Sequence, residues 1–252
     1  MSLCKEGTKR RSKSRVISGR IVGRQALLLK IFDRLYSNFG PQYWWPVGGR
    51  YLGGPSDSSA AFEVMVGAIL TQNTAWSNVE KAIENLRSSG CLTPEAVRRL
   101  PTEKLANLLR PSGYFNIKAQ RLKSFIKFLD QQYGGDVNRM LREEPHLLRQ
   151  KLLAVNGIGP ETADSILLYA GDFPWFVVDA YTKRILSRHG LVPDGVSYQG
   201  LQDFFMKNLP PDRTLYNEYH ALMVRLGKEI CRPEPLCHQC PLVEVLGEPV
   251  HK

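Results

Sequence analysis

Apolar residues recur three or four positions apart along most of the chain, which is the pattern of helices with one buried face. The segments that show this spacing are 28–35, 62–69, 122–129, 148–155, 163–170 and 216–223. Shorter helices are indicated in 77–110, where Gly90, Pro94 and Pro101 interrupt the pattern, and in 201–209. No stretch of the sequence alternates with the period of two that marks a half-buried strand. The sequence therefore predicts an all-α fold.

Two of these helices are separated only by the run Asn156-Gly157-Ile158-Gly159-Pro160. Glycine can adopt positive φ and proline suits the first turn of a helix, so the run predicts a tight helix–hairpin–helix. The two glycines also leave backbone N–H groups unshielded, which favours the binding of an anion such as a phosphate. Taken alone, the pattern is more typical of an ordinary glycine-containing turn in an all-α protein.

The segment after the hairpin makes the pattern more specific. A short apolar run, Trp175-Phe176-Val177-Val178, leads to Asp179 at the start of a further helix over 180–189. The combination of G-I-G-P-E-T-A with V-V-D-A-Y resembles the helix–hairpin–helix DNA glycosylases of the endonuclease III superfamily. The resemblance implies that the Gly157-Ile158-Gly159 segment grips the DNA backbone and that Asp179 is the catalytic carboxylate. An aspartate just before a helix is also a common N-cap, and the two roles are compatible.

Two more segments carry the resemblance, which runs from about Arg24 to Cys240. They are Leu70-Thr71-Gln72-Asn73-Thr74 and Gly113-Tyr114-Phe115-Asn116-Ile117-Lys118-Ala119. In the family, the residue that matches Gln72 fills the gap left by a flipped nucleotide, and we expect Lys118 to contact DNA as well. From the residue alone, Gln72 would be an ordinary surface glutamine at a helix end.

The resemblance also implies a bilobal architecture. A six-helix lobe over 59–171, ending in the helix–hairpin–helix, would be inserted into a second helical lobe formed by 23–58 and 172–252, with the active site in the cleft between them. Residues 1–22 hold seven basic residues against one acidic residue and are too poor in apolar residues to form a core, so we expect a disordered basic tail there. This tail could bind phosphates, or it could be a solubilising leader or, in a eukaryote, a nuclear address.

The net charge of +10 favours a polyanionic partner. Together with the resemblance, it predicts a protein that binds double-stranded DNA as a monomer. No apolar run approaches the roughly 18 residues needed to span a bilayer, so no membrane association is expected. The apolar run at 25–29 is interrupted by Lys30 and does not resemble a secretory signal. We expect a cytoplasmic, nucleoid-associated protein in a bacterium or a nuclear protein in a eukaryote.

Glu161 is an informative departure from part of the family. Members that also cut the DNA backbone carry a lysine at this position, and its amine attacks the sugar to form a Schiff base. A carboxylate cannot do this. The sequence therefore predicts a monofunctional glycosylase without lyase activity, in which water is the nucleophile.

Three tryptophans indicate which base is removed. The W-W-P and T-Q-N-T segments most resemble the 3-methyladenine DNA glycosylase (type III) branch, where the positions that match Trp44, Trp45 and Trp76 line the base pocket. N-alkylated purines are electron-poor or cationic, so indole faces attract them by stacking and cation–π contact. The alternative is that one or more of these tryptophans simply belongs to the core.

A cysteine group near the C-terminus consists of Cys231, Cys237 and Cys240. It resembles the iron–sulfur loop of the family, which uses four cysteines, but Leu246 stands about where the fourth is expected. Three alternatives remain open. A [4Fe-4S] cluster could use another fourth ligand such as His251, a zinc ion could use His238 or His251, or the loop could be a remnant without metal. We favour a cluster or its remnant over zinc.

Taken together, the sequence predicts a DNA glycosylase of base excision repair that flips a damaged base, most plausibly an alkylated purine, out of duplex DNA and hydrolyses its N-glycosidic bond. One alternative is an oxidised-pyrimidine glycosylase of the endonuclease III type. Another is a non-catalytic helix–hairpin–helix DNA-binding protein. Asp179 argues against the second alternative, because a protein that only binds DNA has no need of this carboxylate.

Overall fold

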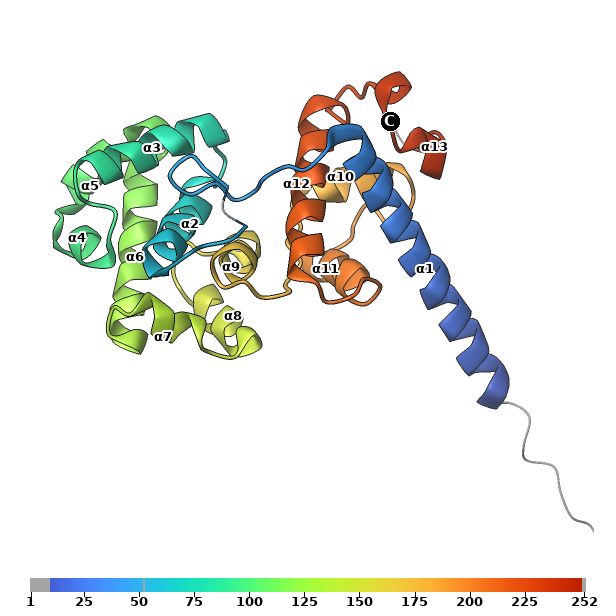
Figure 1. Ribbon diagram of the computed structural model, residues 1–252, viewed down its shortest axis with the longest axis horizontal. Coiled ribbons are helices and arrows are strands. Elements are labelled where there is room, and N and C mark those ends of the chain that lie inside the picture. Colours follow the sequence, from blue (N-terminus) through green and yellow to red (C-terminus); the bar gives the residue numbers. More distant parts are fainter. Residues whose placement is uncertain (1–9, 52, 251–252) are drawn as a thin grey trace, which may run out of the picture. The chain divides into compact units, whose positions relative to one another are not determined.

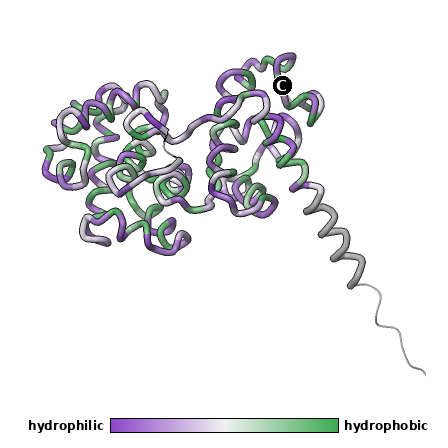
Figure 2. Tube along the Cα trace, viewed as in Figure 1, coloured by the Kyte–Doolittle hydropathy of each residue, from purple (hydrophilic) through white to green (hydrophobic). Residues whose placement is uncertain are grey.

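The computed structural model describes residues 10–51 and 53–250. Over these residues the secondary structure is helical, apart from an isolated β-bridge between Val47 and Arg50, which confirms the predicted all-α fold. Hydrophobic and hydrophilic positions are interleaved along the helices, as expected for helices with one buried face (Figure 2). None of the described helices is both long enough and apolar enough to cross a membrane.

The chain divides into two compact units (Figure 1). Unit 1 consists of Met1–Gln42, Val178–Pro211 and Tyr219–Lys252, and unit 2 consists of Tyr43–Val177 and Asp212–Glu218. The helices of unit 2 are α2 (Ser58–Leu70), α3 (Trp76–Ser88), α4 (Pro94–Arg99), α5 (Thr102–Leu108), α6 (Phe115–Tyr133), α7 (Val137–Leu141), α8 (Pro145–Leu153) and α9 (Pro160–Ser165). Two short helical turns, η1 (Arg110–Ser112) and η2 (Ile166–Ala170), complete it.

Unit 2 is built around α2. The helix begins after Asp57, whose Oδ1 accepts hydrogen bonds of 2.9 Å from the backbone N–H groups of Ser59 and Ala60. Every residue from Ala60 to Leu70 is buried, because apolar side chains occupy nearly all sides of the helix. Helices α3, α6, α7 and α9 contact it, so α2 forms the centre of this unit.

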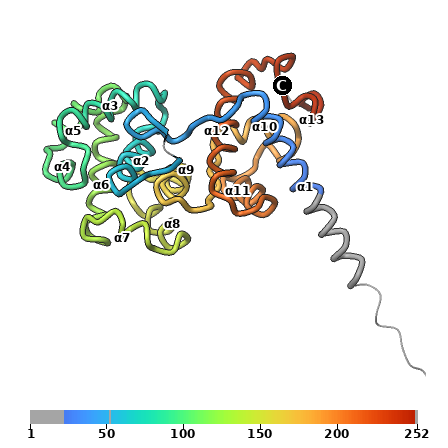
Figure 3. Tube along the Cα trace, viewed as in Figure 1, coloured from blue at the N-terminus to red at the C-terminus, as the bar shows by residue number. Residues whose placement is uncertain are grey.

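Unit 1 takes its helices from both ends of the chain (Figure 3). They are α1 (Arg10–Phe39), α10 (Ala180–Arg188), α11 (Tyr198–Met206), α12 (Arg213–Glu229, whose first turns group with unit 2), η3 (Cys237–Gln239) and α13 (Val243–Leu246). Tyr219 lies at the core of this unit. Its ring packs edge-on against Phe32 and Phe205, and its hydroxyl donates a 3.0 Å hydrogen bond to the carbonyl of Leu28.

The structure differs from two of the predicted boundaries. Helix α1 begins at Arg10, so residues 10–22, predicted to be disordered, are helical, while residues 1–9 lie outside the described residues. Lysine and arginine are good helix formers and can prolong a helix that starts in a packed segment. The second difference is the loop after Gln42, which was expected to belong with α1 but groups with α2. Trp45 packs closely on Gly67, and Gly48 donates a 2.8 Å hydrogen bond to Glu63.

Candidate active site

The hairpin between α8 and α9 uses its two glycines differently. Gly157 has φ +88°, and a Cβ there would lie 2.2 Å from Cγ of Arg121, so glycine is required for both conformation and space. Gly159 has φ −91°, which any residue can adopt, and a Cβ there would meet no atom within 4 Å. Ile158 is buried and donates its N–H to Val155 at 3.1 Å, so it anchors the hairpin from inside the unit. Gly159 is therefore the hairpin glycine with open space in front of it.

Gln72 is attached to this hairpin. Its Nε2 donates hydrogen bonds to the carbonyl of Gly157 at 3.0 Å and to Oγ1 of Thr162 at 2.8 Å. Its Oε1 accepts a short hydrogen bond from Arg121. The half-buried glutamine thus connects the turn after α2 with the hairpin. Its predicted role in filling the gap left by a flipped nucleotide stays a prediction.

Lys118 lies elsewhere than the sequence suggests. It was predicted to contact DNA, but only 1% of its surface is exposed. Its Nζ donates hydrogen bonds to the carbonyl of Leu70 at 2.7 Å, to Oγ1 of Thr74 at 2.5 Å and to the carbonyl of Ser112 at 2.6 Å. Burial, aided by the nearby charge of Arg121, lowers the pKa of Lys118 to about 8. The three donors of the ammonium group are all used inside the unit, so we assign Lys118 to holding these turns together.

Tyr114 is a candidate that the sequence analysis did not single out. Its side chain is 70% exposed, and its backbone has the left-handed φ of +45°, which is uncommon for a residue with a side chain. It stands directly before α6, two positions from the Ser112 carbonyl that Lys118 binds. The sequence signal that could have identified it is the aromatic residue directly after the glycine of the G-Y-F-N motif.

The three tryptophans predicted to line a base pocket are brought together in unit 2. Ring centroids are 4.7 Å apart for Trp44 and Trp45, 4.6 Å for Trp44 and Trp76, and 5.1 Å for Trp45 and Trp76. Trp45 is buried and also packs against Tyr169 at 5.3 Å, whereas Trp44 and Trp76 are half-buried. Trp45 therefore forms the inner wall of the cluster, and the other two rings keep part of their surface accessible. Whether they hold a base stays a prediction.

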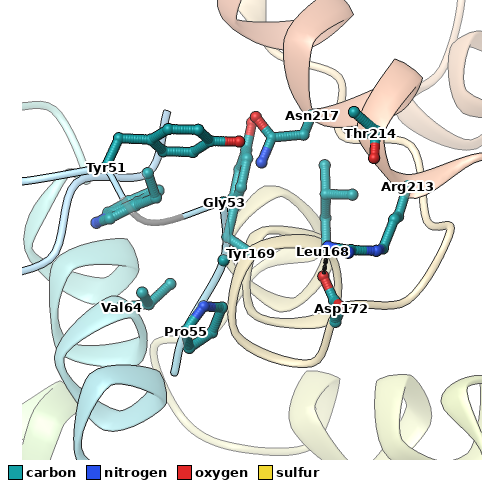
Figure 4. A pocket seen from close by; sticks show the side chains of 12 residues that line it. Tyr51, Gly53, Pro55, Val64, Leu168, Tyr169, Asp172, Arg213, Thr214 and Asn217 are labelled. Atoms are coloured by element: carbon teal, nitrogen blue, oxygen red, sulfur yellow. Dashed lines mark hydrogen bonds and ion pairs between the residues drawn. The ribbon is translucent and has the colours of Figure 1, made fainter. Parts of the chain in front are cut away.

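A small polar cavity of unit 2 adjoins Trp45 (Figure 4). Asn217 also lines it, and an ion pair joins Arg213 to Asp172 at one side. Tyr51 also lines it, and burial, reinforced by the charge of Glu218, raises the pKa of its hydroxyl. The cavity therefore lies directly behind the loop that carries Trp44 and Trp45.

Asp179 caps α10 as the sequence predicts. Its Oδ1 accepts a 2.7 Å hydrogen bond from the N–H of Thr182, and only 8% of its side chain is exposed. Its Oδ2 lies 3.8 Å from Nε2 of His220, a buried residue of α12. Burial lowers the pKa of His220, an effect that the charge of Asp179 partly opposes and that of Lys228 reinforces. One carboxylate oxygen is thus fixed by the backbone and the other faces an imidazole.

Glu161 occupies the exposed second position of α9. The side chain at this end of the hairpin therefore bears a carboxylate where a lyase of this family needs an amine. A carboxylate cannot form a Schiff base with a sugar aldehyde.

The three cysteines of the C-terminal loop line one cavity in unit 1, together with His189. Cys231 accepts a 3.3 Å hydrogen bond from Arg188. Within residues 10–51 and 53–250, however, no three His, Cys, Asp or Glu side chains are arranged to hold a metal ion. Leu246 offers no donor atom and His238 is exposed beside Gln239, while His251 lies outside the described residues. The described residues therefore supply three thiols around one cavity but no complete ligand set for a [4Fe-4S] cluster or a zinc ion.

Comparison with known proteins decides the family. The family model of the HhH-GPD superfamily, base excision DNA repair proteins, matches residues 66–211. The chain belongs to this superfamily. The matched region includes Gln72, Trp76, Lys118, the hairpin and Asp179, whereas Trp44, Trp45 and the three C-terminal cysteines lie outside it. The protein is accordingly a helix–hairpin–helix DNA glycosylase of base excision repair.

Individual relatives of this HhH-GPD protein agree with that assignment. A protein of Methanocaldococcus jannaschii that bears the name of a DNA repair glycosylase is 45% identical over 86% of this chain and 94% of its own. Endonuclease III of Thermotoga maritima is 32% identical over 71% of this chain and 79% of its own. The solved structure of H. pylori 3-methyladenine DNA glycosylase (MagIII), bound to 1,N6-ethenoadenine, covers 80% of this chain and 97% of its own, with 28% identity and a TM-score of 0.67. The resemblance drawn from the sequence is confirmed.

Proposed function

We propose that this protein is a monofunctional DNA glycosylase that hydrolyses the N-glycosidic bond of an alkylated purine in duplex DNA. Two features together carry the proposal. Asp179 is a buried carboxylate fixed by the backbone, and Glu161 places a carboxylate at the position where the lyases of the family need an amine. Asp179 supplies the fixed carboxylate that hydrolysis requires, and position 161 lacks the amine that strand cleavage requires.

Asp179 acts on the sugar. As the bond between C1′ and the base nitrogen breaks, its electron pair leaves with the base, and positive charge builds on the sugar ring. A fixed carboxylate in a water-poor site stabilises that charge strongly. The same carboxylate accepts a proton from the water whose oxygen bonds to C1′. The products are a free base and an abasic strand that is still intact.

The tryptophan cluster supports the choice of base. An N-alkylated purine carries a formal positive charge or a depleted ring, and indole faces bind such rings by stacking and cation–π attraction. Trp44 and Trp76 retain accessible surface for this, with Trp45 behind them. MagIII, which is named for 3-methyladenine and whose structure holds 1,N6-ethenoadenine, adds support because the match covers 80% of this chain and 97% of its own.

DNA binding is assigned to the hairpin and the turns tied to it. The open space at Gly159 leaves room for a phosphate to approach the backbone. Gln72 and the exposed ring of Tyr114 are the side chains available near these turns to occupy the duplex where a nucleotide has been extruded. Aromatic rings stack on bases regardless of sequence, which suits an enzyme that searches for damage.

The test is an excision assay on duplexes that each carry one lesion: 3-methyladenine, 1,N6-ethenoadenine or an oxidised pyrimidine. We expect free alkylated purine, with strand cleavage only after alkali, and no adduct trapped by borohydride. Asp179→Asn should slow excision about 10²–10³-fold while lesion binding survives, because the lost interaction belongs to the transition state. Efficient borohydride trapping by the wild-type protein would exclude a monofunctional enzyme, and release of the oxidised pyrimidine alone would favour the endonuclease III type.

Two matched comparisons sharpen this assay. Trp76→Ala should reduce excision of alkylated purines by about tenfold or more, whereas Tyr36→Ala, which removes an exposed aromatic from α1, should leave it unchanged. Glu161→Lys places an amine at the lyase position and should raise borohydride trapping above the wild-type level. If Trp76→Ala excises every lesion at the wild-type rate, the tryptophans belong to the core and the base pocket lies elsewhere.

A further inference from the structure

The geometry points to His220 as the positioning residue that keeps the Asp179 carboxylate oriented and unneutralised during the reaction. This inference rests on the proposed catalytic role of Asp179. The two side chains come from different helices, α12 and the start of α10, and both are about nine-tenths buried. Their facing atoms, Nε2 of His220 and Oδ2 of Asp179, are 3.8 Å apart.

The contact indicates which ring nitrogen of the neutral imidazole carries the proton. A carboxylate oxygen only accepts hydrogen bonds, so a neutral imidazole faces it favourably with a protonated Nε2 and unfavourably with the lone pair of that nitrogen. Oδ1 of Asp179 is already fixed by the N–H of Thr182. At 3.8 Å an N–H at Nε2 makes no hydrogen bond to Oδ2, but its positive end still attracts the charge of that oxygen and favours one rotation of the carboxylate. Oδ2 therefore keeps its negative charge available to the sugar.

The charge state of His220 then matters for the reaction. Asp179, the N-cap of α10, and Lys228 of α12 both act on this imidazole, in opposite directions. Burial outweighs the attraction of Asp179, so the pKa of His220 lies below its usual value and the ring is neutral at pH 7. A protonated ring would form an ion pair with Asp179 and take the place of the sugar cation as its partner. Excision should therefore fall as His220 becomes protonated.

The experiment measures single-turnover excision of an alkylated purine between pH 5 and pH 8. For the wild-type protein we expect an acid limb with a midpoint below pH 6.5 and a slope of about tenfold per pH unit. His220→Gln, which keeps an N–H donor but does not titrate, should retain most of the activity at pH 7 and lose this limb. His220→Phe, which removes the donor, should lower excision about 10–100-fold at every pH, as losing the partner that orients a functional group does, with lesion binding unchanged.

A second readout separates this inference from the proposed function. The pKa of His220, followed by the NMR shift of its ring protons, should fall further in Asp179→Asn, because the aspartate raises it. His189→Gln is the matched control: it removes another histidine whose pKa burial lowers, but at the cysteine cavity, and should leave the acid limb unchanged. If His220→Gln keeps the wild-type acid limb while Asp179→Asn is inactive, the role of His220 is refuted and the glycosylase proposal stands. If no lesion is excised by any variant, the proposed function fails instead.

Discussion

At the scale of single residues, the two hairpin glycines lead to opposite expectations. Gly157→Ala forces a side chain into a left-handed conformation and against the stem of Arg121. About 2–3 kcal/mol of strain and overpacking should lower the Tm by about 4–12 °C, at about 2–4 °C per kcal/mol for a chain of this size. Gly159→Ala has neither conflict and should leave the Tm within about 2 °C. Thermal unfolding of both variants checks this difference.

The same pair tests the hairpin as a DNA contact. A methyl group at Gly159 projects into open space on the protein, so it matters only if another molecule approaches there. We expect Gly159→Ala to bind duplex DNA several-fold more weakly despite normal stability. A Gly159→Ala protein that folds and binds DNA like the wild type would remove the hairpin from the binding surface.

These glycines also show the limit of the sequence. The G-x-G run correctly located the hairpin. It did not show that Gly157 is required by its positive φ and its close neighbour, whereas Gly159 is restricted by neither. That distinction depends on Arg121 of α6, whose stem reaches the hairpin only in the folded unit. A pattern along the chain gives backbone tendencies, whereas the neighbours of a residue depend on the packing of distant segments.

At the scale of elements, Lys118 holds together turns that belong to separate parts of the sequence. Lys118→Met leaves the buried carbonyls of Leu70 and Ser112 without their donor, which costs about 1–3 kcal/mol for each unsatisfied group. The turn after α2 should loosen as a result, so excision should fall as well as stability. Lys123→Met is the control, since Lys123 also binds backbone carbonyls but near α4, away from these turns.

The pH dependence of stability provides the check on Lys118. The pKa of Lys118 is lowered to about 8 in the folded protein, against about 10.4 for an unfolded lysine. Between these values the unfolded chain binds more protons, so this group makes the folded protein more stable as pH rises through the window, and contributes no change below it. Denaturant unfolding at pH 7.5 and pH 9.5 should show this rise for the wild type relative to Lys118→Met. Parallel pH curves for the two proteins would contradict a buried ammonium at this site.

The prediction for Lys118 was wrong for a reason that applies to other elements. A lysine in a segment next to other candidate DNA contacts is typical of a phosphate-binding residue. Its partners are carbonyls of two turns and a threonine hydroxyl, and no sequence pattern reports where a carbonyl points. The helices themselves were predictable, because their apolar spacing is local information.

At the scale of the whole molecule, the all-α fold and the family could be predicted, whereas the segment on which the two-unit description and the predicted lobes differ most is the loop after Gln42. The loop after Gln42 was expected to belong with α1, and the contacts that place it with α2 involve Trp45, Glu63 and Gly67. The cysteine loop is a similar case. The spacing of its thiols left a cluster, a zinc ion and a metal-free remnant open, and among the described residues no three His, Cys, Asp or Glu side chains are arranged to hold a metal ion.

The net charge is also a property of the whole molecule, and it is unevenly distributed. Residues 1–22 hold seven basic residues and one acidic residue, and so contribute more than half of the net charge of +10. Binding to undamaged duplex DNA should weaken with salt, with a slope of about −0.9 in log K against log salt for each phosphate contact. Removing residues 1–22 should make this slope shallower and lower the affinity at low salt about tenfold or more. Fluorescence anisotropy across a salt series measures both quantities.

The control for this deletion is a full-length variant in which the seven basic residues are replaced by glutamine. If charge is what matters, it should match the deletion, because glutamine keeps the chain length and the tendency to form a helix. Excision measured with enzyme in excess should stay at the wild-type rate in both proteins, since the described core of unit 1 starts only at Leu28. Equal salt slopes for the wild type and both variants would mean that DNA is held entirely by the rest of the chain. The hairpin and its attached turns would then have to supply every phosphate contact.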